Sequence, residues 1–328
     1  MTTSESVHPL SDQYNRTFSK LRLSVTDRCT FRCFYCRWEE KLLPRENILT
    51  FEEMAKLARL LSREGIREIR LTGGEPLRRK HLEELVLQLK EIQGISRISL
   101  TTNGDALHEK AFILKQAGLD DVNVSLDTLK PEKFREICGV GALDNVLRGI
   151  HAAKKAGLSP KANCVVIRGM NDDEIVPLIL WSREHDVPLR FIEWMPTEGI
   201  PWDKKRVVTE NEILEKAKQI GHALPLVTGN GPATVYTMQE MSLTFGIIPT
   251  ISNPFCRFCN RMRISSEGVL YPCLFSHNGL DLKTLLRSPH HSDDEILFRI
   301  RQTLFHKGEG FAASETQRVN IPMVRMGG

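Results

Sequence analysis

From residue 21 to about residue 195, short apolar segments alternate with longer helical segments, and this alternation restricts the fold more than any other feature of the sequence. The short segments predict strands at 21–26, 68–72, 97–102, 121–126, 162–167 and 189–194. The longer segments predict helices at 51–64, 80–92, 107–117, 144–157 and 172–186. Strands and helices in this succession form a parallel sheet with right-handed crossovers. We therefore predict an α/β fold built as an open or partial TIM-like barrel.

Single residues mark the ends of several predicted helices. Thr50 stands before Phe-Glu-Glu and suits the N-cap position of the first helix. Gly65, Gly94, Gly118 and Gly157 follow predicted helices, where a left-handed C-terminal cap favours glycine.

Polar residues lie at the carboxyl ends of five predicted strands. They are Thr26-Asp27, Thr72–Glu75, Thr101–Asn103, Ser125–Asp127 and Glu193–Met195. In parallel barrels this edge carries the active site. Some of these residues serve as caps and turn formers, but five strand ends exceed that need, so the pattern favours an enzyme.

The chain changes character after about residue 195. A loop-like stretch at 196–208 and a helix at about 210–220 precede residues 224–232, whose glycines and prolines indicate a linker. Beyond it we predict short strands near 233–240, 243–248, 261–265 and 268–272, and a helix at about 293–305. We expect three parts, namely a flexible N-terminal segment at 1–20, a partial barrel at 21–222 and a smaller C-terminal region at 223–328.

Three cysteines follow the first predicted strand at C-x3-C-x2-C spacing, and they are Cys29, Cys33 and Cys36. Thiolates at this density hold a soft metal or an iron–sulfur cluster. A structural zinc site needs four protein ligands, whereas three cysteines on a cubane leave one iron free. A zinc knuckle or chance clustering is the alternative.

A second triad has C-x2-C spacing followed by one distant cysteine, and it comprises Cys256, Cys259 and Cys273. Two interpretations remain open for it. One is a Cys3His zinc site completed by His277, and the other is a second cubane whose open iron binds substrate.

Arg261 and Arg263 lie beside the second triad on a predicted strand, where alternate residues share a face. Guanidinium groups match phosphate oxygens, so the pair favours a phosphate-bearing ligand. The alternative is a pair of solvated surface arginines.

The cysteine count indicates the redox compartment of the protein, and the net charge indicates which ligands it could bind. The eight cysteines form the two triads plus Cys138 and Cys164, and clustered thiols indicate metal rather than disulfides. The net charge of +4 suits a polyanionic small molecule as well as a nucleic acid. The sequence contains no apolar run of the ~18–20 residues that span a membrane, and its N-terminus lacks the apolar core of a signal peptide. We expect a protein of the reducing cytoplasm that binds neither membrane nor nucleic acid.

Taken with both triads, several sequence blocks resemble one radical S-adenosylmethionine (SAM) family, the GTP 3′,8-cyclases, also called molybdenum cofactor biosynthesis protein A. The blocks are LRLSVTDRCTFRCFYC, IREIRLTGGEPLRR, LTTNG, VNVSLDTL, RGMNDDE, LRFIEWM, FCRFCNRMRISSEG and the final Gly327-Gly328. They cover the chain from about residue 20 to its end. One departure is Arg37-Trp38, where family members commonly carry Met-Pro.

The resemblance implies a partial barrel of the radical SAM type with a smaller C-terminal cluster-binding region. It also implies two [4Fe-4S] clusters, one on each triad, and SAM as a cofactor. SAM-contacting positions are matched by Tyr35, Gly74, Ser125 and Met195. GTP-binding positions are matched by Arg22, Arg70, Thr101, Lys161, Arg190, Arg261 and Arg263. Gly327 and Gly328 match a tail that reaches the active site and is needed for hydrogen abstraction.

Several of these arginines fall within apolar strands, where an unpaired buried charge is costly. A triphosphate is a sufficient partner for them, although we expect one or two of the set to form structural ion pairs. Cys138 and Cys164 match no ligand position, so we expect both to be buried apolar residues.

The resemblance also implies the reaction and the partners. A 5′-deoxyadenosyl radical from SAM would remove the 3′ hydrogen of GTP, and C3′ would attack C8 of guanine to give 3′,8-cyclo-7,8-dihydro-GTP. The second cluster would hold the guanine while arginines fix the triphosphate. The expected partners are an electron donor of the flavodoxin or ferredoxin type, the downstream cyclic pyranopterin monophosphate synthase and a second copy in a homodimer.

Two other functions predict different features in the sequence. Another two-cluster radical SAM enzyme, such as a peptide maturase, should lack the Arg-x-Arg pair and the terminal Gly-Gly, and both are present. A zinc-dependent nucleic-acid-binding protein should carry sets of four ligands and a basic stripe with interleaved aromatics, and neither is evident.

Overall fold

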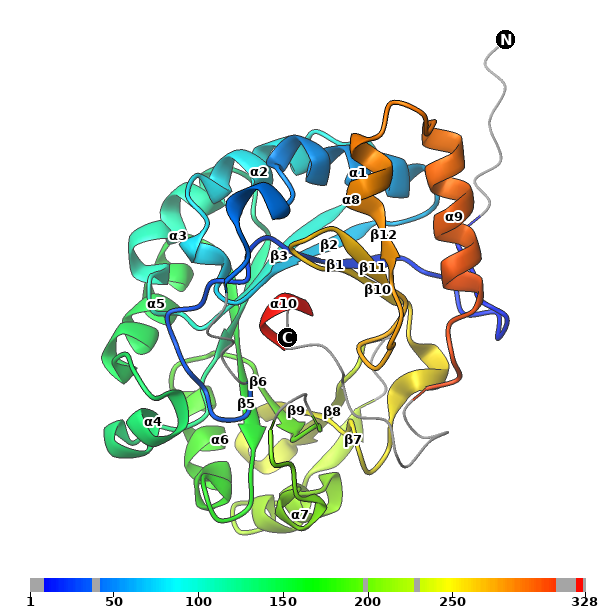
Figure 1. Cartoon of the computed structure of the whole chain (residues 1–328). Helices are drawn as coiled ribbons and strands as arrows, with labels where there is room; N and C mark the ends of the chain where they lie inside the picture. The colour runs from blue at the N-terminus through cyan, green and yellow to red at the C-terminus, as the bar shows by residue number, and fades with distance from the viewer. Residues whose placement is uncertain (1–8, 37–41, 197–199, 227–230, 311–322, 327–328) are drawn as a thin grey trace.

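The strands of the computed structural model form one open sheet of twelve strands. The structure describes residues 9–36, 42–196, 200–226, 231–310 and 323–326. The order across the sheet is β12-β11-β10-β1-β2-β3-β4-β5-β6-β9-β8-β7. The stretch from β10 to β9 is parallel throughout, and the outer strands at both ends pair antiparallel. The sheet curls into a partial barrel with helices on its outside (Figure 1), as the alternating pattern predicted.

The strands are β1 Lys20–Ser24, β2 Glu68–Thr72, β3 Arg97–Thr102, β4 Asp121–Ser125, β5 Ser159–Val166, β6 Leu189–Glu193, β7 Leu224–Leu226, β8 Thr234–Met238, β9 Leu243–Ile248, β10 Arg261–Ile264, β11 Val269–Tyr271 and β12 Leu280–Asp281. The helices are α1 Phe51–Arg63, α2 Leu82–Lys90, α3 Leu107–Gln116, α4 Pro131–Cys138, α5 Leu143–Lys155, α6 Ile175–Glu184, α7 Glu210–Ala217, α8 Leu282–Arg287, α9 Asp293–Phe305 and α10 Met323–Met326. All the predicted strands and helices are present. The helices α4, α8 and α10 and the strand β12 were not predicted, and residues 224–226 form β7 instead of part of the expected linker.

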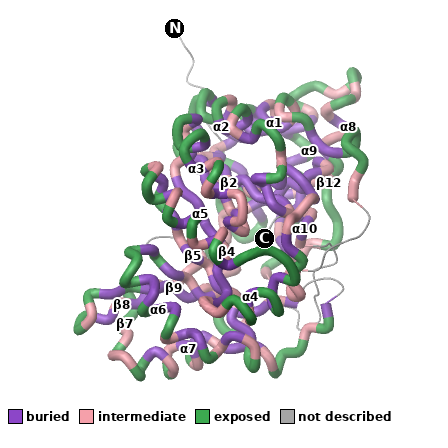
Figure 2. The backbone as a smooth tube through the Cα atoms, turned by 90° about the vertical axis from the view of Figure 1, so that its left-hand side faces the viewer, coloured by how far each residue is buried: buried purple, intermediate pink, exposed green. Residues whose placement is uncertain are grey.

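Alternate residues of each central strand face opposite sides of the sheet. On β1, Leu21 and Leu23 are buried among the helices, whereas Arg22 faces the barrel interior. On β2, Ile69 is buried in the same way and Arg70 faces the interior. The apolar core therefore lies between sheet and helices, and the barrel interior receives polar side chains. Figure 2 shows buried positions along both the strands and the helices.

The helix ends match the sequence expectations. Thr50 forms a capping box with Glu53, in which each side chain accepts a hydrogen bond from the backbone of the other. The glycines expected as C-terminal caps all have positive φ, between 80° and 99°, and they are Gly65, Gly94, Gly118 and Gly157.

Residues 9–19, the described part of the N-terminal segment, are packed on the core, whereas we expected this segment to be flexible. Leu10 and Phe18 are buried in the main core, and Leu10 N donates to the Glu64 carbonyl after α1. A bridge between Ser11 and Thr17 closes this segment into a short loop. Apolar anchors at both ends of the loop give the physical reason for the difference.

Strands from the C-terminal region extend the sheet at both of its ends. β10 lies beside β1, with Arg263 opposite Arg22, and β9 lies beside β6. The sheet thus continues without a break across the domain boundary that we predict at 222–223. None of the helices in the described residues combines the length and apolar character needed to cross a membrane.

Candidate functional site

A cavity of about 440 Å³ occupies the barrel interior, and all six cysteines of the two triads line it. The first triad follows the carboxyl end of β1. Cys256 and Cys259 precede the start of β10, which runs parallel to β1, and Cys273 follows the antiparallel β11. The two triads therefore lie at opposite edges of the sheet. The site extends through the barrel and is not confined to the carboxyl edge that the sequence indicated.

Two neighbouring elements fix the loop of the first triad. Arg32 N and Phe34 N donate to the carbonyls of Cys138 and Ile137, at the C-terminal end of α4. The unpredicted helix α4 thus supports the cysteine loop. Cys138 is buried as expected, but its thiol also forms a hydrogen bond with Cys33.

The Gly73-Gly74-Glu75 turn after β2 packs directly on the backbone that leads to Cys29. Gly74 N donates to the Thr26 carbonyl at 2.8 Å. A Cβ on Gly74 would lie 2.6 Å from the Arg28 carbonyl oxygen, so this position requires glycine. The contact between Gly74 and the backbone of the cysteine loop is therefore sufficient to explain why glycine stands here.

Glu75 connects this turn to the end of β3. Its buried carboxylate accepts hydrogen bonds from Thr102 Oγ1 and Asn103 N, both at 2.7 Å. Burial raises the pKa of Glu75 to about 7. Asn103 in turn donates to Thr30 Oγ1 at 2.8 Å, and its Nδ2 lies 3.9 Å from Cys29 Sγ. Glu75 and Asn103 therefore hold β3 against the first triad.

The four predicted SAM-contacting residues all line the cavity, and they are Tyr35, Gly74, Ser125 and Met195. Tyr35 Oη donates to Asp127 Oδ2 at 2.6 Å. Burial raises the pKa of Asp127 to about 6, and Val165 N donates to its other oxygen at 2.8 Å. Asp127 thus orients the Tyr35 ring at the cavity wall.

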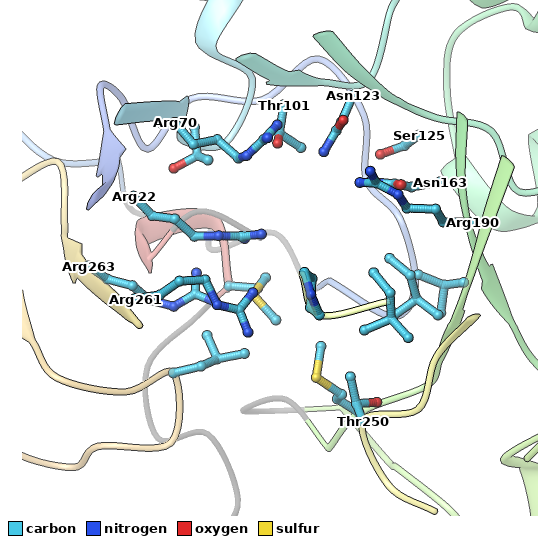
Figure 3. A pocket seen from close by; sticks show the side chains of 18 of the residues that line it. Arg22, Arg70, Thr101, Asn123, Ser125, Asn163, Arg190, Thr250, Arg261 and Arg263 are labelled. Carbon is cyan, nitrogen blue, oxygen red and sulfur yellow. The ribbon is translucent and has the colours of Figure 1, made fainter. Parts of the chain in front are cut away.

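Three guanidinium groups form a row across neighbouring strands. Arg22 lies opposite Arg263 on one side and opposite Arg70 on the other. Figure 3 shows their side chains, and those of Arg190 and Arg261, pointing into one shared space. Burial and the charges of Arg263 and Arg261 lower the pKa of Arg22 well below its usual value. All seven predicted GTP-binding residues line the cavity, and they are Arg22, Arg70, Thr101, Lys161, Arg190, Arg261 and Arg263.

One buried carboxylate, Asp121 at the start of β4, lies among these cations. Arg97 Nε contacts Asp121 Oδ2 at 2.7 Å. Arg70 Nη2 and Lys161 Nζ lie farther from Oδ1, at 3.7 and 3.8 Å. Two of the seven predicted GTP-binding residues, Arg70 and Lys161, thus share an acidic partner.

Buried polar atoms without a hydrogen-bond partner among the described residues line the same space. They are Arg70 Nη1, Thr101 Oγ1, Asn123 Oδ1 and Asn163 Oδ1. Buried polar atoms are normally paired. These atoms therefore indicate a cavity shaped for a polar ligand.

The second triad lies in cationic surroundings that favour thiolates. Burial alone would raise the pKa of Cys259, but the charges of Arg261 and Lys307 and hydrogen bonds from Arg261 lower it to about 6. Deprotonated thiolates are the form that binds metal. This donor set therefore suits an anionic iron–sulfur cluster.

The Cys3His alternative with His277 requires four ligands around one ion, each about 2.0–2.3 Å from it. Among the described residues, no group of three or more Cys, His, Asp or Glu side chains could hold a single metal ion. The thiolates of a cubane bind different irons and need not converge on one point, whereas the four ligands of a tetrahedral zinc ion must do so.

Gly327 and Gly328 lie outside the described residues, as do Arg37 and Trp38. The helix that precedes the terminal glycines, α10, lies inside the ring of strands in Figure 1. Met326 is fully buried against Tyr271 and Leu274, and Met323 lines the cavity.

Sequence reasoning missed several polar residues of the site, namely Arg97, Asp121, Asn123, Asn163 and Lys307. The first four occupy interior-facing positions of β3, β4 and β5, so strict alternation along those strands could have identified them. Lys307 follows α9, and no local pattern marks it.

Comparisons with known proteins agree with this geometry. A family model described as the Radical SAM superfamily matches residues 23–181, and one described as Molybdenum Cofactor Synthesis C matches residues 187–313. The GTP 3′,8-cyclase of Thermodesulfovibrio yellowstonii is 42% identical over 325 residues, covering 97% of this chain and 100% of the relative. The GTP 3′,8-cyclase of Pelotomaculum thermopropionicum is 43% identical and covers 85% of this chain and 88% of the relative.

A likeness to a solved structure concerns the fold alone. The crystal structure of Streptococcus suis SuiB bound to S-adenosylmethionine has a TM-score of 0.62 and 16% sequence identity. The match covers 86% of this chain and 69% of that chain.

Proposed function

The chain belongs to the GTP 3′,8-cyclase family of radical SAM enzymes, and from this premise we propose that it cyclises GTP to 3′,8-cyclo-7,8-dihydro-GTP, the first step of molybdenum cofactor biosynthesis. The family matches confirm the resemblance that the sequence motifs indicated. The observation that carries the substrate assignment is the row of Arg263, Arg22 and Arg70 between two cysteine triads.

The chain uses SAM and iron–sulfur chemistry, as the radical SAM superfamily does. We propose two [4Fe-4S] clusters, one held by Cys29, Cys33 and Cys36 and the other by Cys256, Cys259 and Cys273. When bound, SAM and the first cluster supply the radical that removes a hydrogen atom from GTP. Tyr35, Gly74, Ser125 and Met195 would hold SAM beside the first triad, with Asp127 fixing the Tyr35 hydroxyl.

The arginine row would bind the triphosphate. Arg22 and Arg190 form no hydrogen bond or ion pair with another described residue, and both face the cavity. A buried cation without an acceptor is costly, and guanidinium forks match phosphate oxygens. The phosphate groups of GTP would supply acceptors for Arg22 and Arg190, with Arg263 beside Arg22 in the same row.

Other residues would position the reacting sugar. Thr101, Asn123 and Asn163 each have an unpaired side-chain oxygen, and all three line the cavity that the arginines also line (Figure 3). Hydrogen bonds from ribose hydroxyls or guanine amines would pair these oxygens. Because the radical must meet one C–H bond among many, fixing both ends of the nucleotide is the main task of the chain. We also propose that the terminal Gly327 and Gly328 take part in hydrogen abstraction, as the family resemblance implies.

The remaining proposals concern partners and organisation. The reaction requires one electron at the first cluster, and we propose a donor of the flavodoxin or ferredoxin type. We also propose a homodimer, delivery of product to cyclic pyranopterin monophosphate synthase, a cytoplasmic location and the division at residues 20 and 222.

Metal analysis of protein reconstituted without oxygen tests the cluster proposal. Wild type should hold about eight irons per chain with matching sulfide, and Cys256→Ala and Cys273→Ala should each hold about four. Cys164→Ala, which removes a buried cysteine at neither triad, is the matched control and should keep eight. GTP turnover should be lost in the two triad variants.

Two results would contradict the proposal. Four irons in wild type, with zinc at the second triad, would remove the second cluster and its substrate role. A colourless protein with zinc alone would contradict radical SAM chemistry itself.

A further inference from the structure

Lys307 is a buried lysine whose ammonium group contacts the second cysteine triad. Only 2% of the residue is exposed. Its Nζ lies 3.4 Å from Cys259 Sγ, 3.2 Å from the Cys259 carbonyl and 2.9 Å from the Arg261 carbonyl. The same nitrogen lies 4.7 Å from the centroid of the Phe18 ring. All three protons of the ammonium group therefore have an acceptor, and every acceptor lies at the start of β10.

A second buried cation holds the backbone around Lys307. Arg16 is 6% exposed and its Nε donates to Asp12 Oδ2 at 2.6 Å. Its other nitrogens donate to the carbonyls of Cys256 at 3.0 Å, Gly308 at 2.6 Å and Glu309 at 2.8 Å. The ion pair in the N-terminal loop thus fastens residues 307–310, which we call the strap, to the second cysteine loop.

The strap lies directly against the cysteine sulfurs. Gly310 has φ +143°, and a Cβ there would lie 2.6 Å from Cys256 Sγ. Glycine is therefore required where the strap crosses Cys256. The strap contacts Cys259 through Lys307 and Cys256 through Gly310, so it covers two of the three second-triad ligands.

No carboxylate among the described residues accounts for the burial of the Lys307 ammonium group. Among the described residues, no Asp or Glu forms an ion pair with it, and the negative groups that act on it are Cys259 and Cys273. Burying a cation without a counter-charge is strongly unfavourable because the ion loses its hydration. An anionic metal–thiolate cluster would be the missing counter-charge.

We propose that Lys307 is a positioning residue of the second cluster, donating a hydrogen bond to Cys259 Sγ, and that the Asp12–Arg16 pair keeps the strap in place for this contact. The inference rests on the proposed function because it assumes the second cluster. Hydrogen bonds to ligand sulfurs orient the ligands and influence the reduction potential of a cluster. A donor stabilises the more negative reduced state, so Lys307 raises the potential of the second cluster.

The test isolates the second cluster in the full chain. Cys29→Ala, Cys33→Ala and Cys36→Ala together remove the first set of ligands and serve as the parent. Lys307→Met removes the donor at similar length, and Lys307→Gln retains an N–H donor. Lys56→Met removes a half-buried lysine of α1 that pairs with Asp293 of α9 and contacts neither triad, and it is the matched control.

The measurements are iron per chain, the rate of iron loss to a chelator and the midpoint potential followed by electron paramagnetic resonance. In Lys307→Met we expect iron loss to be about 10- to 100-fold faster than in the parent, and the potential to move lower. Lys307→Gln should recover part of both changes, and Lys56→Met should match the parent. Arg16→Gln, which leaves Lys307 intact, should also accelerate iron loss because the strap is released.

The outcomes separate this inference from the function on which it rests. If the parent holds iron and Lys307→Met has the parent's potential and rate of iron loss, the role of Lys307 is refuted while the second cluster stands. If the parent binds no iron, the second cluster and the role of Lys307 fail together. Circular dichroism identifies unfolding, and if Lys307→Met is unfolded, Lys307→Gln and Arg16→Gln decide by the same criteria.

Discussion

Replacing Arg22 with methionine should weaken GTP binding and at the same time stabilise the protein without ligand. Arg22 lies in register between Arg263 and Arg70, and burial and its neighbours lower its pKa well below the usual value. Its positive charge is therefore unfavourable in the empty cavity. Methionine fills similar volume and removes the repulsion, so the free energy of unfolding should rise by about 0.5–2 kcal/mol, the range typical of single stabilising substitutions.

The loss in affinity follows from the contacts that Arg22 would give up. A hydrogen bond to a charged group contributes about 1.5–3 kcal/mol, which corresponds to about 10- to 150-fold in Kd. Because Arg22 has no other hydrogen-bond or ion-pair partner among the described residues, nothing replaces the lost phosphate contact. Titration calorimetry with GTP, on protein reconstituted without oxygen and without SAM, measures the affinity.

Arg97→Met is the matched control because Arg97 lies on the same interior face but pairs with buried Asp121 at 2.7 Å. Its removal should destabilise the protein by about 1–3 kcal/mol, since a buried carboxylate loses its nearest donor. Arg22→Met and Arg97→Met should thus shift the unfolding midpoint in opposite directions. Wild-type GTP affinity in Arg22→Met, or a destabilisation equal to that of Arg97→Met, would refute the reasoning.

Three further perturbations test other parts of the site. Gly74→Ala should lower the iron content of the first triad and the melting temperature, because the new Cβ would lie 2.6 Å from a backbone carbonyl of the cysteine loop; unchanged iron would contradict this. Tyr35→Phe should cost about 1–3 kcal/mol and weaken SAM binding in calorimetry, because Asp127 loses its 2.6 Å donor. The folded-state pKa of Glu75 is raised to about 7 from 4.5, so the folded state binds its proton more tightly and wild-type stability falls as pH rises through that window. In urea unfolding, the loss of unfolding free energy in Glu75→Gln relative to wild type should therefore become smaller between pH 4.5 and pH 7. A loss that stays constant over this range would show that Glu75 does not titrate there.

The features that the sequence predicted well are those set by local periodicity. Apolar residues at every second position, such as Leu21 and Leu23, predicted the strands and their buried face. The positive φ of Gly65 and Gly118 follows from their place after a helix. Cysteine spacing identified both triads, and the family motifs pointed to eleven further residues that line the cavity.

The features that the sequence missed depend on contacts between distant residues or on weak local patterns. Asp121 begins a strand, where a carboxylate resembles an ordinary surface residue, and only the sheet register brings Arg70, Arg97 and Lys161 to it. Lys307 contacts Cys259, 48 residues earlier in the chain. The strand β7 contains Pro225, which indicated a linker, but an edge strand tolerates a residue without an N–H.

The parallel pairing of β1 with β10 sets the distance between the two cysteine triads. One cysteine triad follows the end of β1 and the other begins before β10, so the length of β1 separates them. Five residues span four rises of about 3.3 Å, or about 13 Å. A ligand must span this distance to contact both triads at once. The barrel therefore selects for an elongated molecule by its length as well as by its charge. Inserting a residue into β1 would therefore change the distance between the triads. It would also turn the Arg22 side chain away from its neighbours Arg263 and Arg70.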